Sequence, residues 1–155
     1  MSKPSEAAVL AWVRLLRAHQ AALSTVEAAL TAAGHPPLEW YDVLLELERT
    51  GSLRPRDLQV RLLLAQSNLS RLLDRMVAAG LVERHPCADD GRGHLVAATE
   101  AGRALRQRMW PAYAGAIETA VGSRLKDDEA RSVADLLGRL VELAGTGNLR
   151  CSVAK

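Results

Sequence analysis

Aromatic residues and cysteines are scarce in this 155-residue chain. Phenylalanine is absent, and three Trp and two Tyr are the only aromatic residues, so Leu, Val and Ala must fill the core. Such a core favours helices, because Ala and Leu are strong helix formers. Two cysteines exclude the disulfide framework of a small secreted domain. The sequence lacks a signal-peptide core and any run of about 18 apolar residues, so we expect a cytoplasmic protein.

Basic residues are concentrated in the middle of the chain, although the formal net charge is only +2. Residues 52–108 contain 10 Lys and Arg against 6 Asp and Glu, a balance of +4. Residues 1–51 contain 4 against 6, and residues 109–155 contain 6 of each. A local basic excess is typical of nucleic-acid-binding surfaces and also of ordinary solvated faces. The motifs in this segment must therefore distinguish between the two interpretations.

The central segment has the pattern of a winged helix-turn-helix. An apolar stripe at helical spacing consists of Leu69, Leu72, Leu73, Met76 and Val77. The opposite face carries Ser67, Ser70, Arg71, Asp74 and Arg75. Gly80 ends this helix, and strand-like runs at residues 81–85 and 94–98 flank a turn-forming loop at residues 89–93. A helix with a cationic outer face fits the major groove of DNA, and a basic-tipped hairpin can reach the neighbouring minor groove.

The predicted fold is mainly α with a small β-hairpin wing, in which dimerisation helices at both chain ends flank the winged helix-turn-helix. Periodicity and the Gly and Pro positions predict the other helices at residues 5–33, 38–49, 55–63, 99–124 and 127–144. We also expect a short extended piece at residues 53–54, N-caps at Thr99 and Asp127, and a bend at Trp110-Pro111. The terminal helices have broad apolar faces, which a second copy related by two-fold symmetry would bury.

The chain resembles the MarR family of bacterial transcriptional regulators over nearly its whole length. The resemblance lies in the runs Ser70–Met76 and Gly80–Arg84, the Asp-x-Arg wing signature Asp90-Gly91-Arg92, and the junction Thr99–Gly102. These motifs are weak singly and specific in this order and spacing. Ala65 departs from the family pattern, which has a capping Ser or Thr there, so the recognition helix is expected to begin at Gln66 or Ser67.

The resemblance implies a homodimeric repressor of a palindromic operator that a small-molecule effector releases, with no enzymatic activity and no cofactor. It implies one domain over residues 1–155, with dimerisation helices at 1–34 and 105–147, the winged helix-turn-helix at 38–102, and a flexible tail at 148–155. In the family a wing arginine enters the minor groove and an aspartate orients it, which would be Arg92 and Asp90 here. A narrow minor groove attracts a guanidinium because its negative potential is enhanced.

The candidate DNA contacts combine this implication with the polar residues around the recognition helix. Arg71 and Arg75 lie one helical turn apart and would meet bases or phosphates, while small polar side chains near the helix start would bond base edges or phosphates. The full expected set is Arg54, Arg56, Gln66, Ser67, Asn68, Ser70, Arg71, Arg75, Asp90 and Arg92.

An effector site is expected between the dimerisation helices and the winged helix, where the family holds small molecules that are often aromatic acids. Trp12 and His19 in the first helix and Trp40 and Tyr41 in the second are the candidates to line it, with a small aromatic or phenolic molecule as ligand. The competing interpretation is that these four are ordinary core or dimer-interface residues.

Three other functions stay open at this point. A metal site would use the hairpin residues His85, Cys87, Asp89, Asp90 and His94, although their spacing matches no closed zinc pattern. A redox switch would use Cys87, whose thiol lies in sequence between Arg84 and Arg92. A winged helix can also serve protein interaction alone. An enzyme is disfavoured, because no nucleophile–base pair or phosphate-binding loop is formed.

Overall fold

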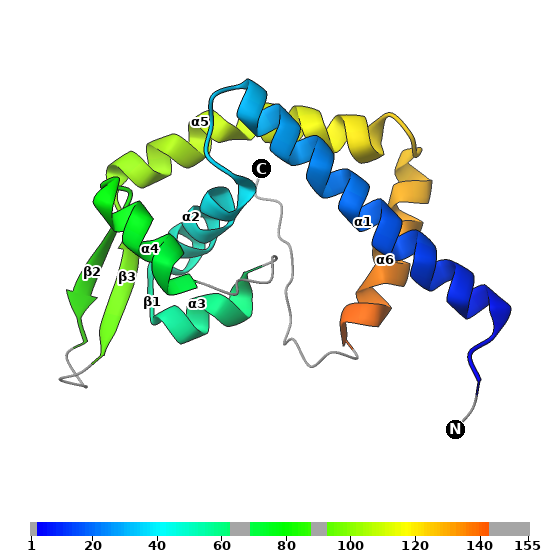
Figure 1. Cartoon of the computed structure of the whole chain (residues 1–155), viewed down its shortest axis with the longest axis horizontal. Helices are drawn as coiled ribbons and strands as arrows, with labels where there is room; N and C mark the ends of the chain where they lie inside the picture. Colours follow the sequence, from blue (N-terminus) through cyan, green and yellow to red (C-terminus); the bar gives the residue numbers. More distant parts are fainter. Residues whose placement is uncertain (1–2, 63–68, 88–92, 143–155) are drawn as a thin grey trace.

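A computed structural model of the chain describes residues 3–62, 69–87 and 93–142 and confirms the expected fold class (Figure 1). The elements are α1 (Glu6–Ala32), α2 (Leu38–Thr50), β1 (Ser52–Leu53), α3 (Pro55–Arg61), α4 (Leu69–Ala78), β2 (Val82–Pro86), β3 (His94–Ala98), α5 (Glu100–Ile117), the π-helix η1 (Glu118–Gly122) and α6 (Asp127–Glu142). Helices α2 to α4 and the strands lie at one end of the molecule. Helices α1 and α6 lie at the other, and α5 runs between the two ends.

The helix boundaries follow from local capping. The Ser5 hydroxyl accepts a hydrogen bond from the Ala8 amide (3.1 Å) at the start of α1, which satisfies one of the unpaired amides of a first turn. Gly80 adopts the left-handed conformation (φ 72°) after α4, as a helix C-terminus often requires. The expected N-cap Thr99 is confirmed, since its Oγ1 accepts from the Gly102 amide (3.1 Å) and donates to the Gly80 carbonyl (2.7 Å).

The sheet has three antiparallel strands in the order β1-β3-β2. The predicted hairpin forms between β2 and β3, which pair from Val82↔Ala98 to Pro86↔His94. The short β1, expected only as an extended piece, joins the free edge of β3 through Ser52↔Ala97. Val82, Val96 and Ala98 point into the core while their strand neighbours are more exposed, so the hairpin rests on the protein by one face.

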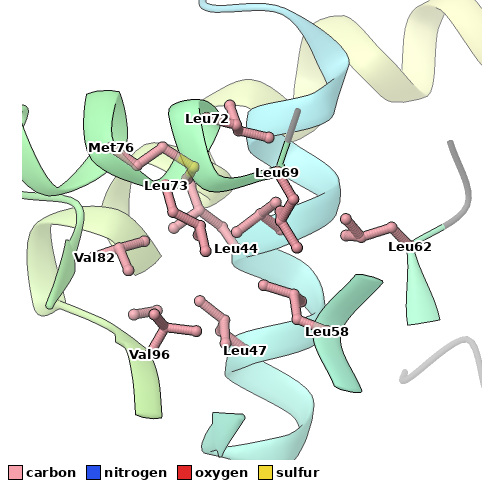
Figure 2. Close-up of a cluster of buried hydrophobic side chains, with 12 residues drawn as sticks. Leu44, Leu47, Leu58, Leu62, Leu69, Leu72, Leu73, Met76, Val82 and Val96 are labelled. Atoms are coloured by element: carbon pink, nitrogen blue, oxygen red, sulfur yellow. The ribbon is translucent and has the colours of Figure 1, made fainter. Parts of the chain in front are cut away.

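The larger core cluster lies around α2 and is filled almost entirely by aliphatic side chains (Figure 2). Leu44 and Leu47 of α2 lie at its centre, with Leu58 of α3 and Val96 of β3 beside them. The predicted stripe of α4 is buried at Leu69, Leu72, Leu73 and Met76. Removing these side chains from water stabilises the fold by about 1.5–3 kcal/mol each, and it fixes which face of α4 meets solvent.

A second cluster joins α1, α2 and α5. Val26 and Leu30 near the end of α1 pack with Tyr41 of α2 and with Met109 and Ala116 of α5. The beginning of α5 instead packs on the winged helix-turn-helix, as the close contact of Gly102 with Leu81 and Leu44 shows. Helix α5 therefore contributes to both clusters.

The C-terminal part differs from expectation in two details. Asp127 is the first residue of α6 rather than its N-cap, and the Glu129 carboxylate accepts a hydrogen bond from the amide of Lys126, the residue before the helix (2.8 Å). The helix expected to run to about residue 124, which includes Pro111, is α-helical only to Ile117 and continues as η1 to Gly122.

Two helices leave broad apolar faces exposed in the single chain. The exposed residues are Val9, Leu10, Trp12, Val13 and Leu16 on α1, and Val133, Leu136, Leu137, Leu140 and Val141 on α6. Among the described residues, no helix is both long enough and apolar enough to cross a membrane. Residues 143–155, which include the expected tail, lie outside the described residues.

Candidate nucleic-acid interface

The outer face of α4 is polar and cationic, as its sequence pattern predicts. Ser70, Arg71, Asp74 and Arg75 are all exposed, because the leucines and Met76 between them occupy the buried face. Four polar side chains thus stand on about one and a half helical turns. This surface has the shape and chemistry that a major-groove helix needs.

Arg75 is held by a partner that the sequence pattern did not reveal. Its Nη2 lies 3.0 Å from Oε1 of Glu39 in the first turn of α2. The Arg75 side chain is 61% exposed and the Glu39 side chain 28% exposed, so solvent and DNA can still reach the guanidinium. Acidic residues are common in the first turn of a helix, where they interact favourably with the helix dipole, so the sequence gives no reason to pair Glu39 with Arg75. The two side chains meet because α2 packs against α4.

A second ion pair joins the wing to α4. Nη2 of Arg84 on β2 lies 2.6 Å from Oδ1 of Asp74. This contact offsets the negative charge of Asp74 on the face that carries Arg71 and Arg75. It also fixes the base of the hairpin relative to α4, which would hold the two DNA-reading elements of a winged helix in register.

The two arginines near the start of α3 have different surroundings. Arg56 is exposed and pairs with the neighbouring Asp57 (3.7 Å). Arg54 is half-buried and its Nη2 donates to the Cys87 sulfur (3.3 Å) at the end of β2. Arg54 therefore ties the start of α3 to the loop end of the hairpin, whereas the exposed Arg56 can exchange Asp57 for a phosphate if DNA approaches this end of the helix.

Five expected DNA contacts lie outside the described residues: Gln66, Ser67, Asn68, Asp90 and Arg92. The chain that flanks the wing loop is described on both sides. The Cys87 amide donates to the Gly93 carbonyl (3.1 Å), so β2 and β3 stay joined up to the residues that border the loop.

The metal alternative gains no support from the described residues, among which no three metal-ligating side chains converge. Asp89 and Asp90 of that candidate set lie outside the described part of the chain. His85 instead pairs with Glu83 on the same strand (3.0 Å), and Cys87 accepts the hydrogen bond from Arg54.

The four candidate effector residues fall into two groups within one chain. Trp12 and His19 are exposed on α1, whereas Tyr41 is buried in the second cluster and Trp40 packs against the larger cluster around α2. Along α1, Trp12 lies about 21 Å from Val26, which is one of the α1 residues buried in that second cluster, because a helix rises about 1.5 Å per residue. In the described structure the buried Nε1 of Trp40 has no hydrogen-bond partner.

Comparison with known proteins agrees with this geometry. A family model described as MarR family matches residues 33–93. The fold also matches a mutant of E. coli MarR complexed with operator DNA, at a TM-score of 0.74 and 25% identity over 85% of this chain and 94% of that one. The central part of the chain thus matches the MarR family in sequence, and its fold as a whole is similar to that of MarR.

Two further solved structures are similar to most of this chain. Sco3205, a MarR family transcriptional regulator from Streptomyces coelicolor solved in complex with DNA, has a TM-score of 0.80 and 23% identity over 92% of this chain and 90% of that one. BpsR from Bordetella bronchiseptica, whose DNA binding is regulated by 6-hydroxynicotinic acid, has a TM-score of 0.78 and 22% identity over 90% and 98%. No curated protein matches the sequence significantly.

Proposed function

We propose that this protein is a MarR-family DNA-binding transcriptional regulator that represses from a palindromic operator as a homodimer. One observation carries the proposal: the only polar face of α4 is exposed and cationic, and it stands beside a hairpin that an ion pair anchors to the same helix. This combination supports a role for α4 in the major groove and for the neighbouring wing in the minor groove. It serves binding rather than catalysis.

The DNA contacts divide by the kind of readout they support. Arg71, whose side chain is exposed on α4, is the candidate to form a bidentate contact with a guanine edge. Ser70 and Arg56 are suited to phosphates, which position the protein without specifying sequence. Arg92, with Asp90 to orient it, is the candidate for the minor groove by its match to the family's wing signature.

The dimer would be built from the apolar faces of α1 and α6. These faces lie on the first and last helices, away from the winged helix-turn-helix (Figure 1). Contiguous apolar surface of this extent is characteristic of an interface, and a two-fold axis lets one patch on each copy bury its equivalent. The same axis would present two copies of α4 to the two halves of a palindrome.

A small aromatic or phenolic effector would bind between the two ends of the molecule. The regulation of the similarly folded BpsR by 6-hydroxynicotinic acid supports this class of ligand. The Trp40 Nε1, which is buried and has no partner in the described structure, would become a donor to such a molecule once the side chains that cover it move. Because Trp12 and His19 lie far along α1 from Tyr41 within one chain, a site that uses all four residues would need α1 of a second copy.

The test is selection of DNA from a random pool followed by titration. We expect a palindrome whose half-site centres are about one helical turn, or about two turns, apart. Replacing Arg71 by Ala should cost about 1–3 kcal/mol and relax the preference at one base pair per half-site. Arg131→Ala, which removes an exposed arginine from α6, is the matched control and should bind like the wild type.

Two outcomes would overturn the proposal. Selection that enriches no sequence would exclude specific recognition. Equal binding by the wild type and Arg71→Ala on selected and scrambled DNA, at two salt concentrations, would remove α4 from the interface. Light scattering of the same preparations tests the dimer, and a monodisperse monomer would contradict it.

A further inference from the structure

Helix α5 is the mechanical connection between the two ends of the molecule. Its beginning packs on the winged helix-turn-helix at Leu81 and Leu44, and Met109 and Ala116 further along pack with α1. Leu105 borders both buried clusters. The position of α4 relative to α1 therefore depends on how α5 is held against α2, which also contributes to both clusters.

Arg106, the next residue along α5, is fastened to α2 at two places. Its guanidinium binds the Glu48 carboxylate as a fork, with Nη2 3.1 Å from Oε1 and Nε on Oε2. Its Nη1 donates to the Tyr41 hydroxyl (3.3 Å), and its Cζ lies 5.7 Å from the centre of the Tyr41 ring. Tyr41 and Glu48 are seven residues apart, so this one side chain contacts α2 over about 10 Å of its length.

The surroundings make this contact stiffer than a surface ion pair. The Arg106 and Glu48 side chains are only 17% and 29% exposed, so water screens the pair weakly. The hydrogen bonds that Arg106 donates to Glu48 raise the pKa of Arg106 above its ordinary value despite the opposing effect of burial, so the charge is permanent. A planar guanidinium that is bound by both edges resists rotation as well as sliding.

An aromatic cluster extends the same contact along α5. Tyr41 meets Tyr113 edge to face, with ring centres 4.9 Å apart, and stacks on Trp110 at 6.3 Å. Three of the five aromatic residues of the chain thus gather at this joint. Arg106, Trp110 and Tyr113 follow one another at helical spacing, so they form a single face of α5 directed at α2.

We propose that Arg106 is a positioning residue that sets the angle between the winged helix-turn-helix and the dimerisation helices, and thereby the half-site spacing that the dimer accepts. The part about spacing rests on the proposed function. The two α4 helices of a dimer must reach successive major grooves together, and one base pair of extra spacing rotates a half-site by about 34° around the DNA axis. A flexible contact between α5 and α2 would let the winged helix-turn-helix turn with the half-site, and a rigid contact would not.

The experiment compares Arg106→Gln and Glu48→Gln with Arg108→Gln, which removes an exposed arginine from the same helix. Each protein is titrated on its selected operator and on operators with one base pair added or removed. We expect the wild type and Arg108→Gln to prefer the selected spacing by about tenfold, and Arg106→Gln to prefer it by about threefold or less. Glu48→Gln should act like Arg106→Gln, and the double variant should add little, because both residues belong to one contact.

A second measurement needs no DNA. Spin labels on cysteines introduced by Ser24→Cys on α1 and Ser70→Cys on α4, both exposed positions, report the distance between the two ends of one chain. The two native cysteines are replaced by Ser, and excess unlabelled protein removes signals between protomers. Arg106→Gln should broaden or shift the distance distribution at unchanged helix content, and Arg106→Lys should restore it only in part because Lys lacks the fork.

The outcomes separate the two proposals. Distances and spacing preference in Arg106→Gln that match those of Arg108→Gln would overturn the role of Arg106. A uniform loss of affinity at all spacings, with narrow distances, would show a merely structural role and overturn it as well. A wild type that binds no selected DNA would instead overturn the proposed function and the part about spacing, while the distances would still decide whether Arg106 sets the angle.

Discussion

Neutralising Glu39 should strengthen DNA binding, because Glu39 holds Arg75 on the face of α4 that we propose meets DNA. The Arg75 Nη2 and Glu39 Oε1 atoms are 3.0 Å apart. A phosphate that approaches Arg75 must compete with this carboxylate and is also repelled by it. Glu39→Gln removes the charge and keeps the size of the side chain, so the fold of α2 should be unaffected.

The expected gain follows from the exposure of the pair. Arg75 is 61% exposed, and pairs of this kind are worth about 0.2–1 kcal/mol. A dimer contains the pair twice, so removing the competition should tighten binding by about 0.4–2 kcal/mol, or about 2-fold to 30-fold. If Arg75 then contacts one phosphate per half-site, the slope of log K against log salt should steepen by up to about 1.8.

The assay is a double-mutant cycle on one operator at two salt concentrations, with wild type, Glu39→Gln, Arg75→Ala and the double variant. The gain from Glu39→Gln should vanish in the Arg75→Ala background. Glu100→Gln, at the exposed start of α5, removes the same charge away from Arg75 and is the control. Weaker binding by Glu39→Gln would refute the competition. An equal gain from Glu100→Gln, or a gain that survives Arg75→Ala, would show that the tighter binding comes from the loss of a negative charge and not from the release of Arg75.

Two other pairs of substitutions test the fold and the wing. Gly102→Ala should destabilise the protein by about 1–3 kcal/mol in thermal unfolding, since a Cβ there would lie 2.2 Å from the Leu81 carbonyl oxygen. Gly115→Ala on the same helix, with open space around it, should be stabilising or neutral, and equal effects would disprove the close contact. Arg92→Ala should weaken operator binding strongly, whereas Asp90→Ala should weaken it less, by about 1–2 kcal/mol of lost side-chain ordering. Tighter binding by Asp90→Ala, or additive effects of the two changes, would rule out the orienting role.

Sequence alone determined the elements of this protein, because the signals that define them are local. The stripe at Leu69, Leu72, Leu73 and Met76 is buried as its spacing predicts, and the hairpin and the Thr99 cap form where the pattern puts them. Helical and strand periods are set by backbone geometry, and caps by side chains three residues away, so both can be recognised without knowing the tertiary structure. The outer face of α4 follows from the same period.

Only the tertiary structure decided which polar residues act together. Glu39 and Arg75 are 36 residues apart, and Arg106 and Tyr41 are 65 apart, so no spacing rule links them. Whether β1 joins the sheet was likewise settled by β3 passing beside it. Charged and hydroxyl groups have many acceptable partners of similar energy, and the packing of the apolar faces chooses among them by bringing particular helices together. The core of this protein could therefore be predicted from its sequence, whereas its ion pairs depended on the packing.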